Sequence, residues 1–221
     1  MFYSRDAKIS ANNIMPAIGV APYNEIAIVN ASTAMTDAEG EIIVAALNEI
    51  LPVFCSDWNL KPVTAVFVPT GAPKTIIPLC CIVFDTTDVD NALGYHDQSA
   101  DVPYAKVFVK AILQYSGAIL QSADSKNPTA AQTISHEVFE LLVDPRANVW
   151  WADSSGATLI AAEVSDPVGS NIVPVIVNGT SVSLSDWILP SWSDPQDMTG
   201  PFNHNNTLKS PLTVDNGGYL I

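Results

Sequence analysis

Basic residues are scarce in this chain. It has nine Lys and Arg against 23 Asp and Glu, which gives a formal net charge of −14. From Ala147 onward the only basic residue is Lys209. Nucleic-acid binding needs basic side chains that neutralise phosphates, so the composition argues against it. An acidic surface tolerates cations, including metal ions and basic peptides, although it can also serve solubility alone.

Long apolar runs and cysteine pairs are lacking as well. No stretch is apolar over the length of a membrane span, and residues 1–6 lack the basic-then-apolar order of a signal peptide. We therefore expect a cytoplasmic or virion-associated protein, with release by host lysis as another route outside. Cys55, Cys80 and Cys81 show neither a disulfide framework nor C-x-x-C spacing, and we interpret all three as small buried residues.

The order of the apolar segments predicts an α/β (α+β) fold. With 221 residues, the chain fits one domain or two lobes that share a cleft. Segment 1–24 is predicted to be irregular and segment 116–128 to be a polar loop, and an acidic turn is expected at residues 85–91. The pattern indicates a mixed sheet backed by two helices. Strands are predicted at 25–30, 63–68, 79–84 (buried on both faces) and 105–109, and helices at 36–51, ended by Pro52, and at about 129–143.

Beyond Pro145 the sequence is richer in Pro, Gly, Asn, Ser and Trp. Two short apolar runs, 172–177 and 182–184, are separated by Asn178-Gly179, which is a hairpin signal. We predict an N-terminal α/β lobe over residues 1–145 that ends in the second helix. A looser C-terminal lobe, residues 146–221, is expected to close a cleft with it.

The second helix carries the chemistry. Its segment 133–145 reads T-I-S-H-E-V-F-E-L-L-V-D-P, so His136 and Glu140 lie four residues apart on one helical face, with Glu137 beside them. The pattern is that of an H-E-x-x-H metal helix with a carboxylate as the second ligand, and Zn²⁺ accepts either donor. Glu137 is then free to act as the base towards a water. The alternative is a solvated charged face, but the neighbouring residues are mostly apolar.

Other residues are candidates to complete this site. Glu163 lies 23 residues beyond Glu140 and Asp166 just after it, a spacing similar to that of thermolysin-like metalloproteases. That likeness implies Glu163 as the third metal ligand and Asp166 as the residue that orients His136 through its other ring nitrogen. Both acids are otherwise ordinary loop or helix residues. His96 is a candidate to stabilise an oxyanion or to help bind the metal, and His204 is another candidate for the oxyanion role. The alternatives are a structural histidine bonded to Asp97 for His96 and an exposed loop histidine for His204.

Several segments resemble uncharacterised bacterial and phage HExxE zincin-like proteins that have the same order of motifs. The likeness runs from about residue 60 to the C-terminus, and a weaker one links part of it to plant exordium-like proteins. Both groups look like zincin-type metallopeptidases by motif, so the resemblance implies a zincin-like fold and pairs the HExxE residues with Glu163 and Asp166. The matching segments are 92–97 (A-L-G-Y-H-D), 106–109 (K-V-F-V), 135–140 (S-H-E-x-x-E), 144–145 (D-P), 162–166 (A-E-V-x-D), 177–179 with 182–183, 185–187 (S-D-W) and 217–219 (G-G-Y).

Two functions follow as hypotheses. The first is a zinc-dependent metallopeptidase-like hydrolase acting on a peptide or protein, with His136, Glu140 and Glu163 as ligands and Glu137 as general base. The second is a phage virion or surface structural protein that keeps a zincin-like fold with little or no catalysis and packs against other virion subunits. The low content of charged residues and the many loops rich in Pro and Asn favour the second hypothesis.

Overall fold

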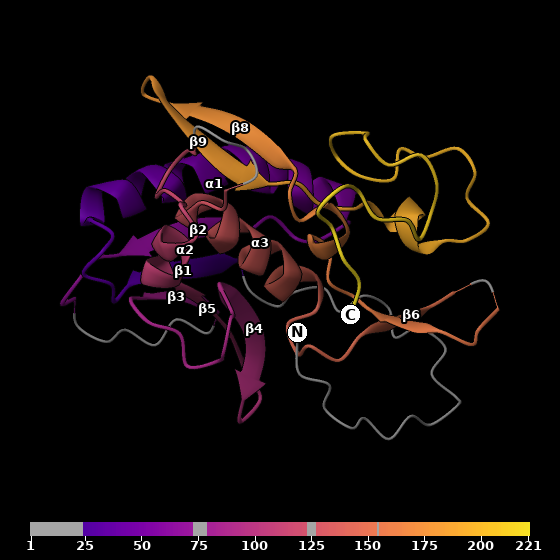
Figure 1. Cartoon of the computed structure of the whole chain (residues 1–221), viewed down its shortest axis with the longest axis horizontal. Helices are drawn as coiled ribbons and strands as arrows, with labels where there is room; N and C mark the ends of the chain where they lie inside the picture. The colour runs from indigo at the N-terminus through magenta and orange to yellow at the C-terminus, as the bar shows by residue number, and fades with distance from the viewer. Residues whose placement is uncertain (1–23, 73–78, 123–126, 154) are drawn as a thin grey trace.

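A five-stranded mixed sheet forms the centre of the chain (Figure 1). The computed structural model describes residues 24–72, 79–122, 127–153 and 155–221, so the irregular segment expected at 1–24 lies almost wholly outside the described residues. Strand order is β2-β1-β3-β5-β4, with all neighbours parallel except β4, which runs antiparallel to β5. The predicted α/β class with a mixed sheet is confirmed. The strands are β1 (Glu25–Asn30), β2 (Thr64–Val68), β3 (Cys80–Phe84), β4 (Gly94–Ser99) and β5 (Val102–Phe108).

Strand β4 was not predicted from the sequence. It pairs with β5 through a two-residue turn at Ala100 and Asp101, which have φ angles of 49° and 64°. Such left-handed pairs match the twist of a tight hairpin. The pairing places His96 opposite Ala105 and turns its side chain towards the protein interior, where it is 9% exposed.

Two long helices and one short helix accompany the sheet: α1 (Asp37–Asp57), α2 (Val109–Gln114) and α3 (Ala130–Val143). The predicted capping box opens α1, because Thr36 Oγ1 accepts from Glu39 N and the Glu39 carboxylate accepts from Thr36 N. The prediction that Pro52 ends this helix is wrong. Proline removes one backbone hydrogen bond, but the following turns bury Phe54 and Cys55 in the core and continue to Asp57.

Helices α1 and α3 pack against the sheet and against each other. Their contact is a stack of Phe54 on Phe139 with ring centroids 4.4 Å apart. The hairpin of β8 (Ile172–Val177) and β9 (Thr180–Ser185) packs on both helices and turns at Asn178 and Gly179, as predicted (Figure 1). Helix α3 is therefore enclosed, and nearly all its side chains are buried.

The centre of the sheet departs from the sequence prediction in one respect. Strand β3 alternates between buried Cys81 and Val83 and half-buried neighbours, so it is not buried on both faces as expected. Cys80 is consequently half-buried, whereas Cys55 and Cys81 are buried as predicted. All three thiols are free.

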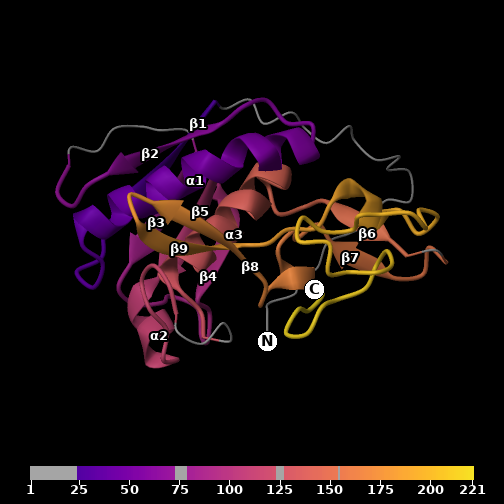
Figure 2. The ribbon, with the colours of Figure 1, turned by 90° about the horizontal axis from the view of Figure 1, so that it is seen from above.

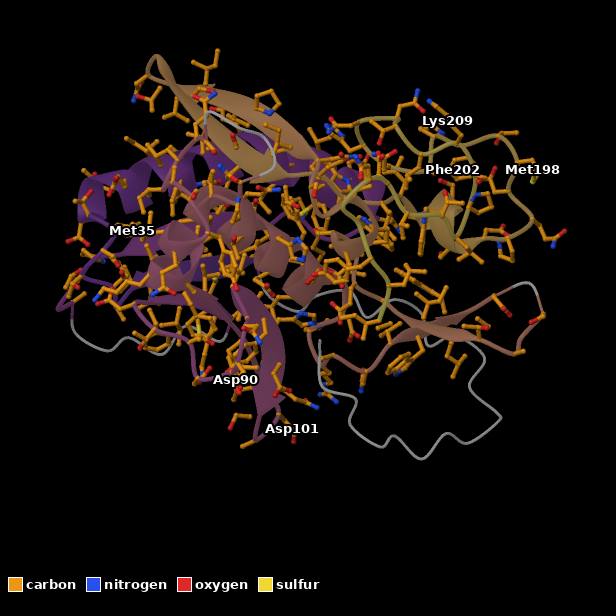
Figure 3. The ribbon with its side chains drawn as sticks, viewed as in Figure 1. Met35, Asp90, Asp101, Met198, Phe202 and Lys209 are labelled. Atoms are coloured by element: carbon orange, nitrogen blue, oxygen red, sulfur yellow. The ribbon has the colours of Figure 1, made fainter. Side chains whose placement is uncertain are left out.

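The chain after Pro145 forms short elements joined by long loops (Figure 2). These are β6 (Trp150–Ala152) paired with β7 (Leu159–Ala161), a 3₁₀ turn η1 (Asp166–Val168), the hairpin β8–β9 and a second 3₁₀ turn η2 (Pro190–Ser193). Lys209 lies on one of the last loops, far from Asp101 at the tip of β4 (Figure 3). The division into lobes at residue 145 stays a prediction. Within the described chain, no helix combines the length and apolarity needed to cross a membrane.

Candidate metal centre

Helix α3 sets the positions of the motif residues. It begins after Thr129, whose hydroxyl accepts from Gln132 N, and it ends at Asp144, whose N–H donates to Glu140 O. His136 and Glu140 then lie one turn apart, with His136 Nε2 3.2 Å from Glu140 Oε1. Glu137 and Glu140 are only 5% and 3% exposed, so this is not a solvated face. Buried carboxylates need partners, and the partners come from two other parts of the chain.

The first partner comes from the start of η1. Asp166 Oδ1 lies 3.0 Å from His136 Nε2. This is the same ring nitrogen that faces Glu140, whereas a residue that orients His136 from behind would contact its other nitrogen. Ser165 N also donates to Glu140 Oε1, at 3.3 Å. Asp166 and Glu140 thus approach the same nitrogen of His136.

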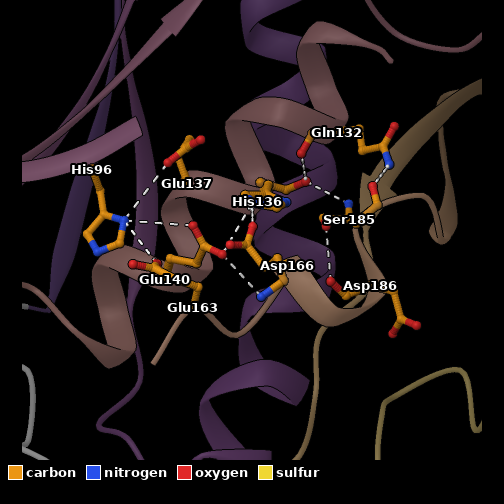
Figure 4. A network of polar contacts seen from close by, with 12 residues as sticks. His96, Gln132, His136, Glu137, Glu140, Glu163, Asp166, Ser185 and Asp186 are labelled. Atoms are coloured by element: carbon orange, nitrogen blue, oxygen red, sulfur yellow. Dashed lines mark hydrogen bonds and ion pairs between the residues drawn. The ribbon is translucent and has the colours of Figure 1, made fainter. Parts of the chain in front are cut away.

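The second partner is His96, from β4. Its Nδ1 lies 3.6 Å from Glu163 Oε2, 3.7 Å from Glu140 Oε2 and 4.0 Å from Glu137 Oε2. All three separations exceed the length of a good hydrogen bond. The structure therefore brings His96 and Glu163 together with the motif, in a group that we call the cluster (Figure 4). Its members are His96, His136, Glu137, Glu140, Glu163 and Asp166.

Glu140 is the centre of the cluster. One of its oxygens faces His136 and the other faces His96, so its carboxylate lies between the two imidazoles (Figure 4). Two sets of donor atoms, each within 4.8 Å of one another, share it: His136, Glu140 and Asp166, and His96, Glu137 and Glu140. Donors that lie about 2.0–2.2 Å from one tetrahedral ion are about 3.3–3.6 Å apart. The spacing suits a metal ion, and the buried His/Glu cluster can hold one.

Gly94 allows Glu137 to reach this position. A Cβ at residue 94 would lie 2.6 Å from Glu137 Oε1 and 3.0 Å from the carbonyl oxygen of Lys106. No real side chain tolerates the first distance without movement. The glycine of the G-Y-H-D segment is thus explained by the close approach of α3 to β4.

Burial changes the protonation of the cluster. Burial, together with the charges of neighbouring carboxylates, raises the pKa of Glu163 to about 8 and that of Glu140 to about 7. Burial also raises the pKa of Glu137 well above its usual range. For His136, burial lowers the pKa, but the charges of Glu140 and Asp166 outweigh it and leave the pKa well above the ordinary value. Without a cation, the cluster therefore holds protons at neutral pH.

Two polar atoms in the cluster are buried without a hydrogen bond. They are His96 Nε2 and Glu163 Oε2, counted against the partners that the described residues offer. Buried polar atoms are nearly always paired in native proteins, and an exception calls for an explanation such as an ion or a water. Glu163 Oε2 is the oxygen that faces His96, which places the unpaired atom inside the cluster.

His204 is not brought to the cluster by any contact in the described structure. Its ring stacks on Trp187 with centroids 4.1 Å apart, and its Nδ1 lies 3.8 Å from Asp57 Oδ2. Trp187 Nε1 donates to the same Asp57 oxygen. This setting is structural, so the expectation that His204 stabilises an oxyanion gains no support from these contacts. The structural alternative for His96, a hydrogen bond to Asp97, is not among the contacts of His96 with the described residues.

The sequence interpretation missed Tyr219. Its backbone N donates to Asp166 O. Its pKa is raised by burial of the phenol and by the charges of Asp166 and Glu140, although 37% of the residue is exposed, so the phenol lies within electrostatic reach of the cluster. Gly218 allows this approach, because a Cβ there would lie 2.1 Å from Pro167 O. The only sequence signal was the G-G-Y segment near the C-terminus.

Comparisons of the chain with protein-family models, curated proteins and solved structures find no match.

Proposed function

We propose that this protein is a zinc-dependent hydrolase with its metal in the cluster, and that its substrate is a peptide or protein. The observation that carries the proposal is the position of Glu140, a buried carboxylate that faces an imidazole on each side. A buried structural ion pair needs one cation for each anion. Here four carboxylates share two imidazoles, which favours a site for a metal cation.

The ligands that the distances favour are His136, Glu140 and Asp166, which we call the His136 site. Asp166 Oδ1 lies 3.0 Å and Glu140 Oε1 3.2 Å from His136 Nε2. Asp166 is here a ligand rather than the orienting residue expected from the sequence. Glu163, the third ligand expected from the sequence, faces His96 instead. A divalent ion in this site would polarise a substrate carbonyl and make a nearby water more acidic.

Glu137 is the proposed general base. It adjoins His136 in sequence but lies on the His96 side of Glu140, so it borders the His136 site without contributing one of its three closest donors. A base works best when its pKa lies near the working pH, and burial moves the pKa of Glu137 up in that direction. Glu137 would take a proton from the attacking water and give it to the leaving amine.

The test is hydrolysis of a peptide library under three conditions: protein loaded with Zn²⁺, protein treated with a chelator, and the His136→Asn variant supplied with Zn²⁺. We expect cleavage only under the first condition. The exposed Glu49 on α1 offers a matched control, and Glu49→Gln should cleave as the wild type does. Cleavage that survives both the chelator and His136→Asn would place the activity elsewhere or in a contaminant.

A further inference from the structure

The His136 site leaves part of the cluster unexplained. His96, Glu163 and the second oxygen of Glu140 take no part in it, yet both carboxylates face the same nitrogen of His96. His96 Nδ1 is 3.6 Å from Glu163 Oε2 and 3.7 Å from Glu140 Oε2. These distances are too long for strong hydrogen bonds and match the spacing of donors around one ion, about 3.3–3.6 Å.

A histidine paired with acids for structural reasons would be bonded differently. The side chain of His96 is 4% exposed, and its Nε2 has no hydrogen-bond partner among the described residues. Its Nδ1 points at three carboxylates without closing on any of them. By contrast, His136 lies at 3.0 Å from its nearest carboxylate oxygen. The carboxylates around His96 thus face its Nδ1 without forming hydrogen bonds to it, as metal ligands do around an ion.

We infer that the cluster holds two divalent cations, bridged by the carboxylate of Glu140. One occupies the His136 site. The other occupies what we call the His96 site, formed by His96, Glu163 and the second oxygen of Glu140. This inference rests on the proposed metal centre and adds a second ion to it.

The bridge follows from the geometry of Glu140. Its Oε1 faces His136 and its Oε2 faces His96, so each oxygen belongs to a different site. Paired ions in enzymes lie about 3.5–4 Å apart and act together on attacking and leaving groups. Charge supports the pair, because ligands bind metal in their deprotonated form and one divalent ion would then leave the four carboxylates of the cluster with excess negative charge.

The donors restrict the chemical class of the second ion. Carboxylate and imidazole ligands suit Zn²⁺, Mn²⁺ and Fe²⁺, and the described part of the cluster offers no thiolate for softer metals. Glu137 also lies in the His96 donor set, with atoms within 4.8 Å of those of His96 and Glu140. We assign Glu163 as the third donor because its Oε2 is nearer to His96 Nδ1, at 3.6 Å against 4.0 Å for Glu137, and lacks a hydrogen-bond partner within the described chain. Glu137 then stays available as a base.

Metal stoichiometry tests the inference without any assay of turnover. The metal-free chain is titrated with Zn²⁺ and its bound ions are counted by native mass spectrometry. We expect two ions for the wild type, one each for His96→Asn and Glu163→Gln, and two for Glu137→Gln. His204→Asn and Glu49→Gln are matched controls from outside the cluster and should bind two. Circular dichroism identifies any variant that has not folded.

Loading with Mn²⁺ gives a second measurement that needs no variant. Two ions bridged by one carboxylate are spin-coupled, so the electron paramagnetic resonance spectrum should differ from that of isolated Mn²⁺. One ion per wild-type chain together with hydrolysis would overturn the second site and leave the proposed function standing. Two coupled ions without hydrolysis would support the second site and overturn the proposed function. A chain that binds no metal would overturn both.

Discussion

Oε2 of Glu140 lies 3.7 Å from Nδ1 of His96, and this contact joins the motif helix α3 to the edge strand β4. The two residues are 44 positions apart in a single chain. The register of β4 on β5 turns His96 inward, and the helical turn of α3 turns Glu140 towards it. Any change that shifts either element should therefore act on metal binding.

Metal should stabilise the folded chain. A ligand that binds only the native state at 100 times its Kd adds about 2.7 kcal/mol to the free energy of unfolding. Thermal unfolding should thus occur at a lower Tm with a chelator than with added Zn²⁺. In Glu140→Gln the same comparison should show little difference, since both sites lose a donor. An equal Tm with and without chelator in the wild type would speak against a bound metal.

The pH dependence of the metal-free chain should be the opposite of that expected for paired surface acids. The folded-state pKa values of Glu140 and Glu163, about 7 and about 8, lie above the ordinary glutamate value of 4.5. Raised pKa values contribute stability that is complete below about pH 4.5 and is lost as pH rises through about 8. Urea unfolding with chelator should therefore show falling stability between pH 5 and pH 9.

Substitution of Glu163 provides the control for that prediction. Glu163→Gln cannot ionise, so its stability should fall less over the same pH range. Metal binding should show the opposite trend, because the ligands must lose protons to bind. Calorimetry in buffers of different ionisation enthalpy should then detect protons released on Zn²⁺ binding near pH 6. Zn²⁺ binding without proton release would contradict the protonation that we assign to the cluster.

Gly94→Ala should damage the centre through Glu137. The new Cβ would lie 2.6 Å from Glu137 Oε1, and overpacking of this kind costs about 1–3 kcal/mol. Chemical unfolding should show that loss. Ser99→Ala, on an exposed position of the same strand, is the matched control and should change stability little. Equal stability of the two variants would mean that β4 and α3 can separate at no cost.

The sequence predicted the parts of this structure that depend on local pattern. The limits of α3, its burial and the hairpin at Asn178-Gly179 follow from apolar spacing, a Thr cap and turn chemistry. Strand β4 was missed because G-Y-H-D-Q-S has no β-branched residue and its pairing depends on β5. The length of α1 was misjudged because burial of Phe54 outweighs the effect of Pro52.

The candidate site was predictable only in composition. His136, Glu137 and Glu140 follow from helical spacing, and Glu163 and Asp166 were recognised as partners. Asp166 faces Nε2 of His136, and Glu163 faces His96. Both contacts depend on how η1 and β4 pack against α3. Tertiary contacts of this kind leave no periodic signal in a sequence.

The measurement that tests the account most directly compares wild type with Glu137→Gln. Both are loaded with Zn²⁺, assayed for bound metal and incubated with the same peptide library. Glutamine keeps the size of the side chain and removes the base, so turnover should fall by about 10²–10⁴-fold while metal content stays unchanged. Cleavage by both proteins at the same rate would contradict the proposed hydrolase activity. So would the absence of cleavage by either protein when metal is bound. The second result would favour a structural protein that binds metal.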